Sequence, residues 1–154
     1  MLKNRIMLGA VVGSAALVPL AGVTALASGP AGAAKPKGIT CSTLSGKVSG
    51  SGVAKINLSG CTGKTGGKGS SKGSATASSG TIKWANGKST TSSESYTGGS
   101  GCPGSDITEV VSGNVTADNT GSTSVGAALS ATICYNASTS KLSLLAGTKF
   151  KFAA

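Results

Sequence analysis

After residue 34, apolar side chains recur at every second position, and no segment carries the 3.6-residue period of an amphipathic helix. The longest alternating run covers residues 125–135, in which Val, Ala, Leu, Ala, Ile and Tyr are separated by small or polar residues. Ser, Thr, Gly and Val dominate the remaining segments, which is the composition of short strands joined by turns. This pattern predicts an all-β fold for residues 35–154.

A β-hairpin is expected at the start of this region. Residues 39–48 and 53–61 form two candidate strands, and the Ser-Gly-Ser-Gly sequence at 49–52 can turn the chain between them. A hairpin centred on Ser51 sets Cys41 opposite Cys61, because both lie ten residues from that centre. Cross-strand neighbours have the short Cβ separation that a disulfide requires.

The four cysteines, Cys41, Cys61, Cys102 and Cys134, all follow residue 34. An even number of cysteines in a small exported chain predicts disulfides, since the compartment is oxidising. Of the three possible pairings, the hairpin favours Cys41–Cys61 with Cys102–Cys134, and each bridge would contribute about 3–4 kcal/mol. A zinc site is the competing interpretation, but the chain has no histidine and no C-x-x-C pair. We therefore expect no metal site.

A second hairpin is indicated around Trp84. Residues 81–85 lead into Asn86-Gly87, which suits a type I′ turn, and the returning strand would cover 88–96. Ile82 and Trp84 alternate with Lys83, so the tryptophan is expected to pack in the core. By contrast, the preceding Gly/Ser/Lys-rich segment at 62–79 is predicted to be a mobile, solvated loop, with a strand near Ala75 left open.

Further strands are expected at 107–117, 125–135, 142–145 and 148–152. With the two hairpins they make about seven or eight short antiparallel strands. The predicted architecture is a single antiparallel β-sandwich, Ig-like or jelly-roll-like, and a small β-barrel is the alternative.

The first 34 residues have the organisation of a secretory signal peptide. Lys3 and Arg5 precede an uncharged, apolar run at 6–27, and cleavage is expected after Ala27 or near Ala34. An uncleaved signal anchor is the alternative, because about 20 apolar residues can span a bilayer. A lipoprotein anchor is disfavoured because the first cysteine is Cys41. The expected location is secreted or extracellular, with association to the cell wall left open and no membrane span after cleavage.

The expected mature part, residues 35–154, carries twelve lysines, no arginine and four acidic residues, a net charge of +8. Such a surface attracts polyanions, and anionic cell-wall polymers are the candidate partners, with contacts at Lys64, Lys68 and Lys72. The lack of arginine argues against specific nucleic-acid recognition, which relies on the bidentate guanidinium group. The alternative interpretation is that the charge only keeps a Gly/Ser/Thr-rich protein soluble.

The sequence contains no complete catalytic motif. The sequence Gly-Lys-Thr at 63–65 lacks the earlier glycine of a phosphate loop, and a histidine-based triad is impossible without histidine. Two-carboxylate chemistry would have to draw on the four acids Glu94, Asp106, Glu109 and Asp118. We predict no catalytic residue, no cofactor and no enzymatic activity.

Several short features follow one another along the chain: GITCS at 38–42, LSGC at 58–61, GTIKW at 80–84, Cys102-Pro103, a strand ending at Cys134, and GTKF at 147–150. In this order they resemble small exported, disulfide-bearing β proteins of actinobacterial type, a group of unassigned function. The resemblance implies export and a disulfide-bonded β domain, and it implies no catalytic residues.

The expected function is therefore that of a secreted or envelope-associated, non-catalytic β-sandwich protein that binds anionic envelope polymers loosely. The rival hypothesis is a small enzyme or enzyme inhibitor that acts through long loops at 62–79 and 97–105.

Overall fold

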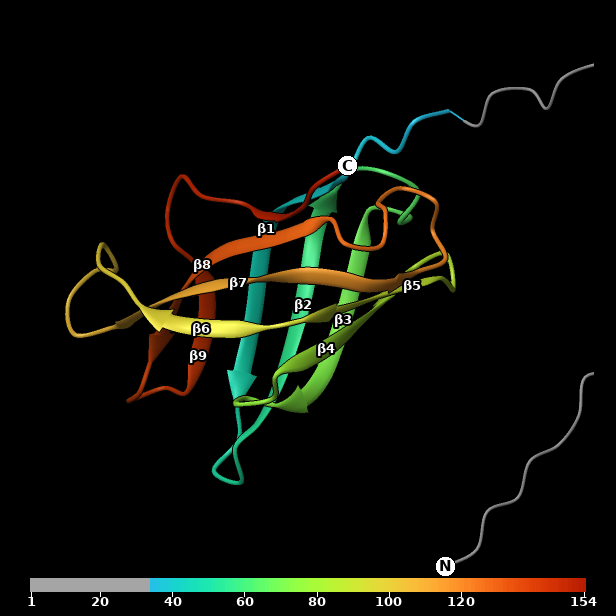
Figure 1. Cartoon of the computed structure of the whole chain (residues 1–154). Helices are drawn as coiled ribbons and strands as arrows, with labels where there is room; N and C mark the ends of the chain where they lie inside the picture. The colour runs from blue at the N-terminus through green and yellow to red at the C-terminus, as the bar shows by residue number, and fades with distance from the viewer. Residues whose placement is uncertain (1–33) are drawn as a thin grey trace, which may run out of the picture. The chain divides into compact units, whose positions relative to one another are not determined.

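The computed structural model describes residues 34–154, so the expectations about signal peptide, anchor and cleavage lie outside the described residues. Ten strands make up this part of the chain, and every pairing between them is antiparallel. They are β1 (Ile39–Val48), β2 (Val53–Cys61), β3 (Lys68–Ser74), β4 (Ser79–Trp84), β5 (Ser89–Ser93), β6 (Ser95–Gly98), β7 (Ile107–Asp118), β8 (Ala128–Asn136), β9 (Lys141–Leu144) and β10 (Phe150–Phe152) (Figure 1). The all-β prediction is confirmed.

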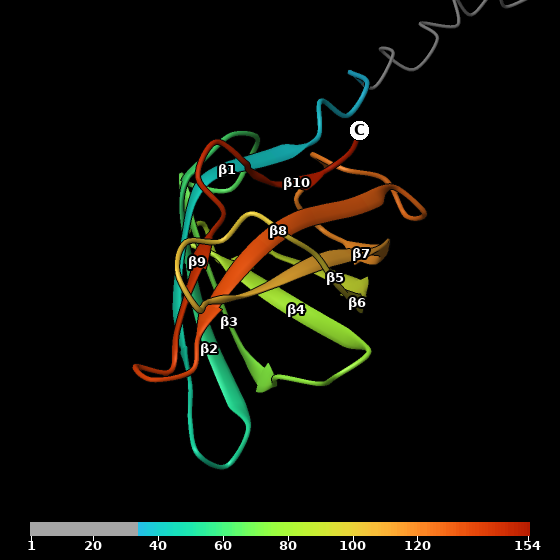
Figure 2. The same ribbon diagram turned by 90° about the vertical axis from the view of Figure 1, so that its left-hand side faces the viewer.

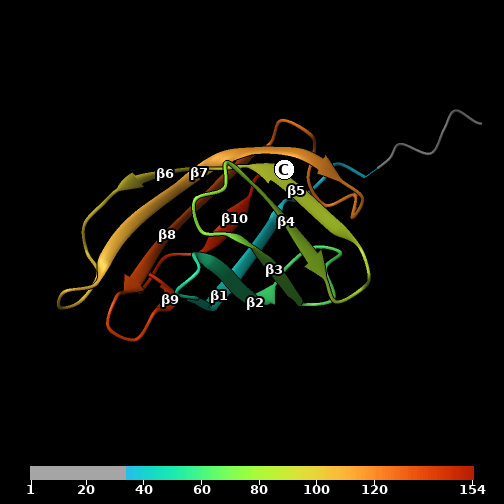
Figure 3. The same cartoon turned by 90° about the horizontal axis from the view of Figure 1, so that it is seen from below.

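Eight of the strands close into a barrel. The hydrogen-bonded order runs β1-β2-β3-β4-β5-β7-β8-β9, and β9 pairs back onto β1. Seen from below, β7 and β8 lie across the interior from β1, β2 and β3 (Figure 3). The predicted sandwich is therefore wrong, and the small barrel offered as the alternative is the architecture. A sandwich and a barrel share the same inward–outward alternation, so the sequence pattern alone does not separate them.

Two further strands, β6 and β10, pair with strands of the closed barrel. The twelve-residue strand β7 pairs along one edge first with β6 and then with β5, which are separated by Glu94. Similarly, β10 pairs with the first residues of β1 and with β8, beyond the point where β9 ends. Both arrangements leave fewer free edges on the sheet, which lowers the risk of edge-to-edge aggregation.

The segment at 62–79, predicted to be a loop, contains β3, which pairs with β2 over seven positions from Val53↔Ser74 to Ser59↔Lys68. Gly69 in this strand has a structural reason. A Cβ at Gly69 would lie 2.5 Å from two carbons of the Trp84 ring, so only glycine leaves room for the indole. The composition of residues 62–79 indicates a loop, because the Trp84 side chain that requires a small residue at position 69 lies on a different strand, β4.

Both disulfides have the pairing that the hairpin favoured. Cys41 and Cys61 are directly opposed on β1 and β2, and Cys102 joins the loop before β7 to Cys134 on β8. No cysteine is left free. Two bridges in a chain of this size indicate an oxidising environment.

One end of the barrel is filled by a compact apolar cluster. Trp84 is 3% exposed and belongs to a buried cluster that includes Leu58, Val115, Leu129 and Phe152. The indole Nε1 donates a hydrogen bond of 2.9 Å to Thr90 Oγ1, and Thr90 donates in turn to Asp118 at 2.6 Å. The expectation that Trp84 packs in the core is confirmed. Within residues 34–154, no helix is long and apolar enough to cross a bilayer.

Candidate functional site: an outer lysine row and a hollow barrel end

The three lysines named from the sequence lie in the turn before β3 and on β3 itself. Lys64 lies in the turn between β2 and β3, where its backbone N–H donates to Ser122 Oγ and its carbonyl accepts from Asn86. Lys68 and Lys72 both lie on β3, at the strand positions that face outward. They share a face because strand side chains alternate, so residues four apart point the same way. Lys68 and Lys72 therefore share the outer face of β3, and Lys64 lies in the turn that precedes this strand.

Lys72 also belongs to a row of lysines on the outer face of the barrel. The strand registers pair Lys141 with Lys47, Lys47 with Lys55, and Lys55 with Lys72. These four residues come from β9, β1, β2 and β3, which form one wall of the barrel (Figure 2), and all four are exposed. We call these four residues the outer lysine row.

The geometry of the outer lysine row follows from the spacing of strands. Neighbouring strands lie about 4.8 Å apart, so four charges occupy a line of roughly 14 Å. Lys68 and Lys83 lie on the same outer face at other positions of β3 and β4. Like charges placed directly opposite each other on a sheet destabilise it. The row is therefore an arrangement that the fold alone does not favour.

Two of the four lysines in this row can be paired from the sequence. The centre at Ser51 that placed Cys41 opposite Cys61 also places Lys47 opposite Lys55, as the register confirms. The position of Lys141 cannot be predicted from the hairpin, because its place beside Lys47 depends on the closure of the barrel through β9.

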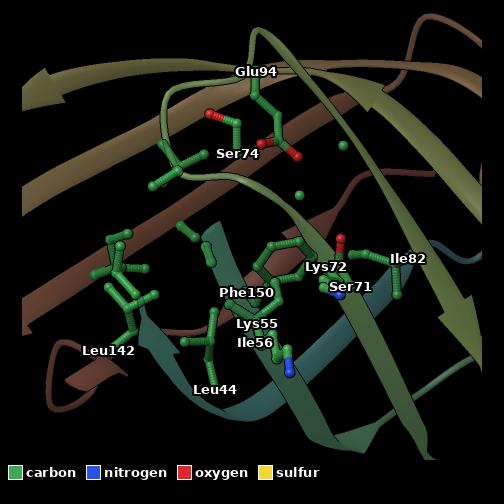
Figure 4. A pocket seen from close by; sticks show the side chains of 18 of the residues that line it. Leu44, Lys55, Ile56, Ser71, Lys72, Ser74, Ile82, Glu94, Leu142 and Phe150 are labelled. Atoms are coloured by element: carbon green, nitrogen blue, oxygen red, sulfur yellow. The ribbon is translucent and has the colours of Figure 1, made fainter. Parts of the chain in front are cut away.

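The barrel end remote from Trp84 is hollow. A cavity of about 760 Å³ lies between the walls, with apolar side chains that include Leu44, Ile56, Leu142 and Phe150 on one side (Figure 4). Its opposite end carries Glu94, whose carboxylate points into the space in Figure 4. The size is within the range of about 300–1,000 Å³ that is typical of small-molecule sites.

The polar end of the cavity is organised around Glu94. Tyr96 Oη donates a hydrogen bond of 2.6 Å to Glu94 Oε2, and Ser92 Oγ donates to Oε1 at 3.4 Å. Burial raises the pKa of the Tyr96 hydroxyl above its ordinary value, and the hydrogen bond to Glu94 and the nearby charges of Glu94 and Glu109 raise it further. Tyr96 therefore stays protonated and holds the carboxylate in place.

The four acids considered for catalysis occupy two kinds of position. Asp106 accepts a hydrogen bond of 2.6 Å from Asn136, and Asp118 accepts bonds from Thr90 and Thr120, so both organise loops. Glu94 and Glu109 both line the cavity. The sequence alone does not predict that Glu94 and Glu109 line the same cavity, because this depends on the pairing of β6 with β7.

Among residues 34–154, no group of three or more metal-ligating side chains is brought together. Comparison with protein-family models, with curated proteins and with solved structures finds no match. Within residues 34–154, the candidate binding features are the outer lysine row and the cavity.

Proposed function

We propose that the protein is an exported, non-catalytic barrel that binds linear anionic polymers of the cell envelope along the outer lysine row. The observation that carries this proposal is the register that aligns Lys141, Lys47, Lys55 and Lys72 across four adjacent strands. A polymer with closely spaced phosphates or carboxylates could lie across these strands and contact each ammonium group in turn. The two disulfides support residence in an oxidising compartment.

The placement of the charges distinguishes this function from a merely solubilising one. For solubility, lysines serve equally well at scattered positions, and interspersed charges of both signs avoid mutual repulsion. Here four lysines oppose one another with no acid between them in the register. Local arrangements that oppose stability are expected at functional sites, because another benefit must keep them.

The proposal predicts a specific loss of binding in the double variant Lys55→Gln/Lys72→Gln. Affinity for long-chain inorganic polyphosphate should fall about tenfold at low salt, because each exposed charge contact contributes up to about 1 kcal/mol. The slope of log K against log salt should become shallower by about 1.4, if the value of about 0.7 per contact for single-stranded nucleic acids holds. Binding isotherms between low and moderate sodium chloride measure both quantities.

The matched control is Lys149→Gln/Lys151→Gln, which removes the same charge at exposed positions outside the outer lysine row. It should retain most of the affinity and the slope. Equal losses of affinity in the two double variants would mean that binding depends only on net charge, which would contradict the proposal. Envelope binding that persists undiminished at high salt would also contradict it. Hydrolytic turnover that Glu94→Gln or Glu109→Gln abolishes would favour the rival enzyme hypothesis instead.

A further inference from the structure

The hollow end of the barrel opens through its wall. Strands β3 and β4 pair only at Gly69↔Trp84 and Ser70↔Lys83, and beyond these positions they diverge toward the turn at 75–78. The residues on both sides of this gap, 70–76 and 79–83, line the cavity. A small molecule therefore has a route from solvent to the interior that does not require the barrel to unfold.

Small inward residues create the space. On β3 the inward positions are Gly69, Ser71 and Gly73, since Gly69 packs against the Trp84 ring and strand side chains alternate. A Cβ at Gly73 would meet no atom within 4 Å, so this position borders open space. Gly80 and Ala54 also line the cavity, whereas the filled end has Leu58 and Trp84 on the same two strands.

The carboxylates and the lysines that line the cavity come from different positions of the barrel. Glu94 and Glu109 line it, and so do Lys55, Lys72 and Lys83, which occupy exposed, outward positions of β2, β3 and β4. The Glu94 carboxylate accepts from Tyr96 and Ser92, and its two oxygens offer further acceptor sites. A carboxylate held against apolar walls attracts a cation more strongly than it would in water.

We infer that the cavity binds an organic ammonium compound with an apolar body, its amine head at Glu94 and its body against the wall of Leu44, Ile56 and Phe150. Protonated amines donate up to three hydrogen bonds, which match the free acceptor sites of the carboxylate. This site shares Lys55 and Lys72 with the outer lysine row as lining residues, but it holds its ligand at Glu94 and takes the opposite charge.

The test compares three probes of equal length, octylamine, octanol and octanoate, by calorimetric titration of the oxidised protein. Octylamine should bind about tenfold more tightly than octanol, as a charge-assisted hydrogen bond would produce, and octanoate should bind more weakly than both. Association with the basic outer surface would give the reverse order, with octanoate first. That order, or binding by none of the three probes, would overturn the inference.

Two sets of variants locate the site. In Glu94→Gln/Glu109→Gln, the preference for octylamine over octanol should disappear while octanol still binds. In Gly73→Phe, all three probes should lose at least about tenfold in affinity, because the ring would occupy the cavity. The matched control is Gly98→Phe on β6, where a Cβ also meets nothing within 4 Å but the residue does not line the cavity.

Near-UV circular dichroism of Trp84 reports whether each variant keeps its core. Unchanged probe binding in a folded Gly73→Phe would contradict the inference, and so would an unchanged octylamine preference in the double glutamine variant. If Gly73→Phe fails to fold, the double glutamine variant decides the question alone. Failure of this test leaves polyphosphate binding untouched, so the two proposals can be judged separately.

Discussion

Replacement of Trp84 by alanine is expected to lower the free energy of unfolding by about 4 kcal/mol, as is typical when a large buried aromatic side chain is truncated. The indole is 3% exposed and fills the closed end of the barrel. Its removal would leave a void beside Gly69, which has no side chain of its own to fill the space. Urea denaturation followed by far-UV circular dichroism measures the loss.

The matched variant is Trp84→Phe, which keeps an aromatic ring but removes the indole N–H. It loses the hydrogen bond to Thr90, while Thr90 still donates to Asp118. The expected loss is about 1–2 kcal/mol, the sum of one buried hydrogen bond and a modest change in volume. If Trp84→Ala stayed within about 1 kcal/mol of the wild type, the closed end would not be the principal core.

Removal of the hairpin disulfide by Cys41→Ala/Cys61→Ala is expected to cost about 3 kcal/mol. The bridge closes a loop with a sequence separation of 20, so without it the unfolded chain gains conformational entropy. Cys41 is also fully buried within the core, so the smaller alanine adds a packing defect. Unfolding midpoints in urea, measured without reductant, give the difference from the wild type.

The second bridge provides the comparison. Cys102–Cys134 closes a sequence separation of 32, so its removal should cost a similar or slightly larger amount. Because each loss is a large part of the stability of a small domain, the doubly reduced protein should unfold at physiological temperature. Thiol titration that finds four reduced cysteines in the folded protein would contradict the role assigned to both bridges.

Local pairing could be predicted from the sequence because it depends on neighbouring residues. The turn around Ser51 sets the register of β1 and β2, and this register aligns Cys41 with Cys61. The alternation around Trp84 likewise assigned the tryptophan to the core. In each case the information lies within about twenty residues of the chain.

Closure of the sheet could not be predicted in the same way. Pairing of β9 with β1 joins Lys141 to Lys47 over almost a hundred residues, and neither segment carries a local sign of the other. For the same reason the composition of β3 indicates a loop, since Gly69 and Gly73 are explained only by the Trp84 ring and by the cavity. The candidate site is only partly predictable from the sequence, because the position of Lys141 and the walls of the cavity depend on this closure.

The outer lysine row is tested most directly by footprinting the lysines of the oxidised protein with an acetylating reagent, with and without polyphosphate, and reading each residue by mass spectrometry. Lys47, Lys55, Lys72 and Lys141 should be protected together, although Lys141 is remote from the others in sequence. Lys88, Lys149 and Lys151 should remain as reactive as in the free protein. Protection spread evenly over all lysines, or centred on Lys64, would contradict the account.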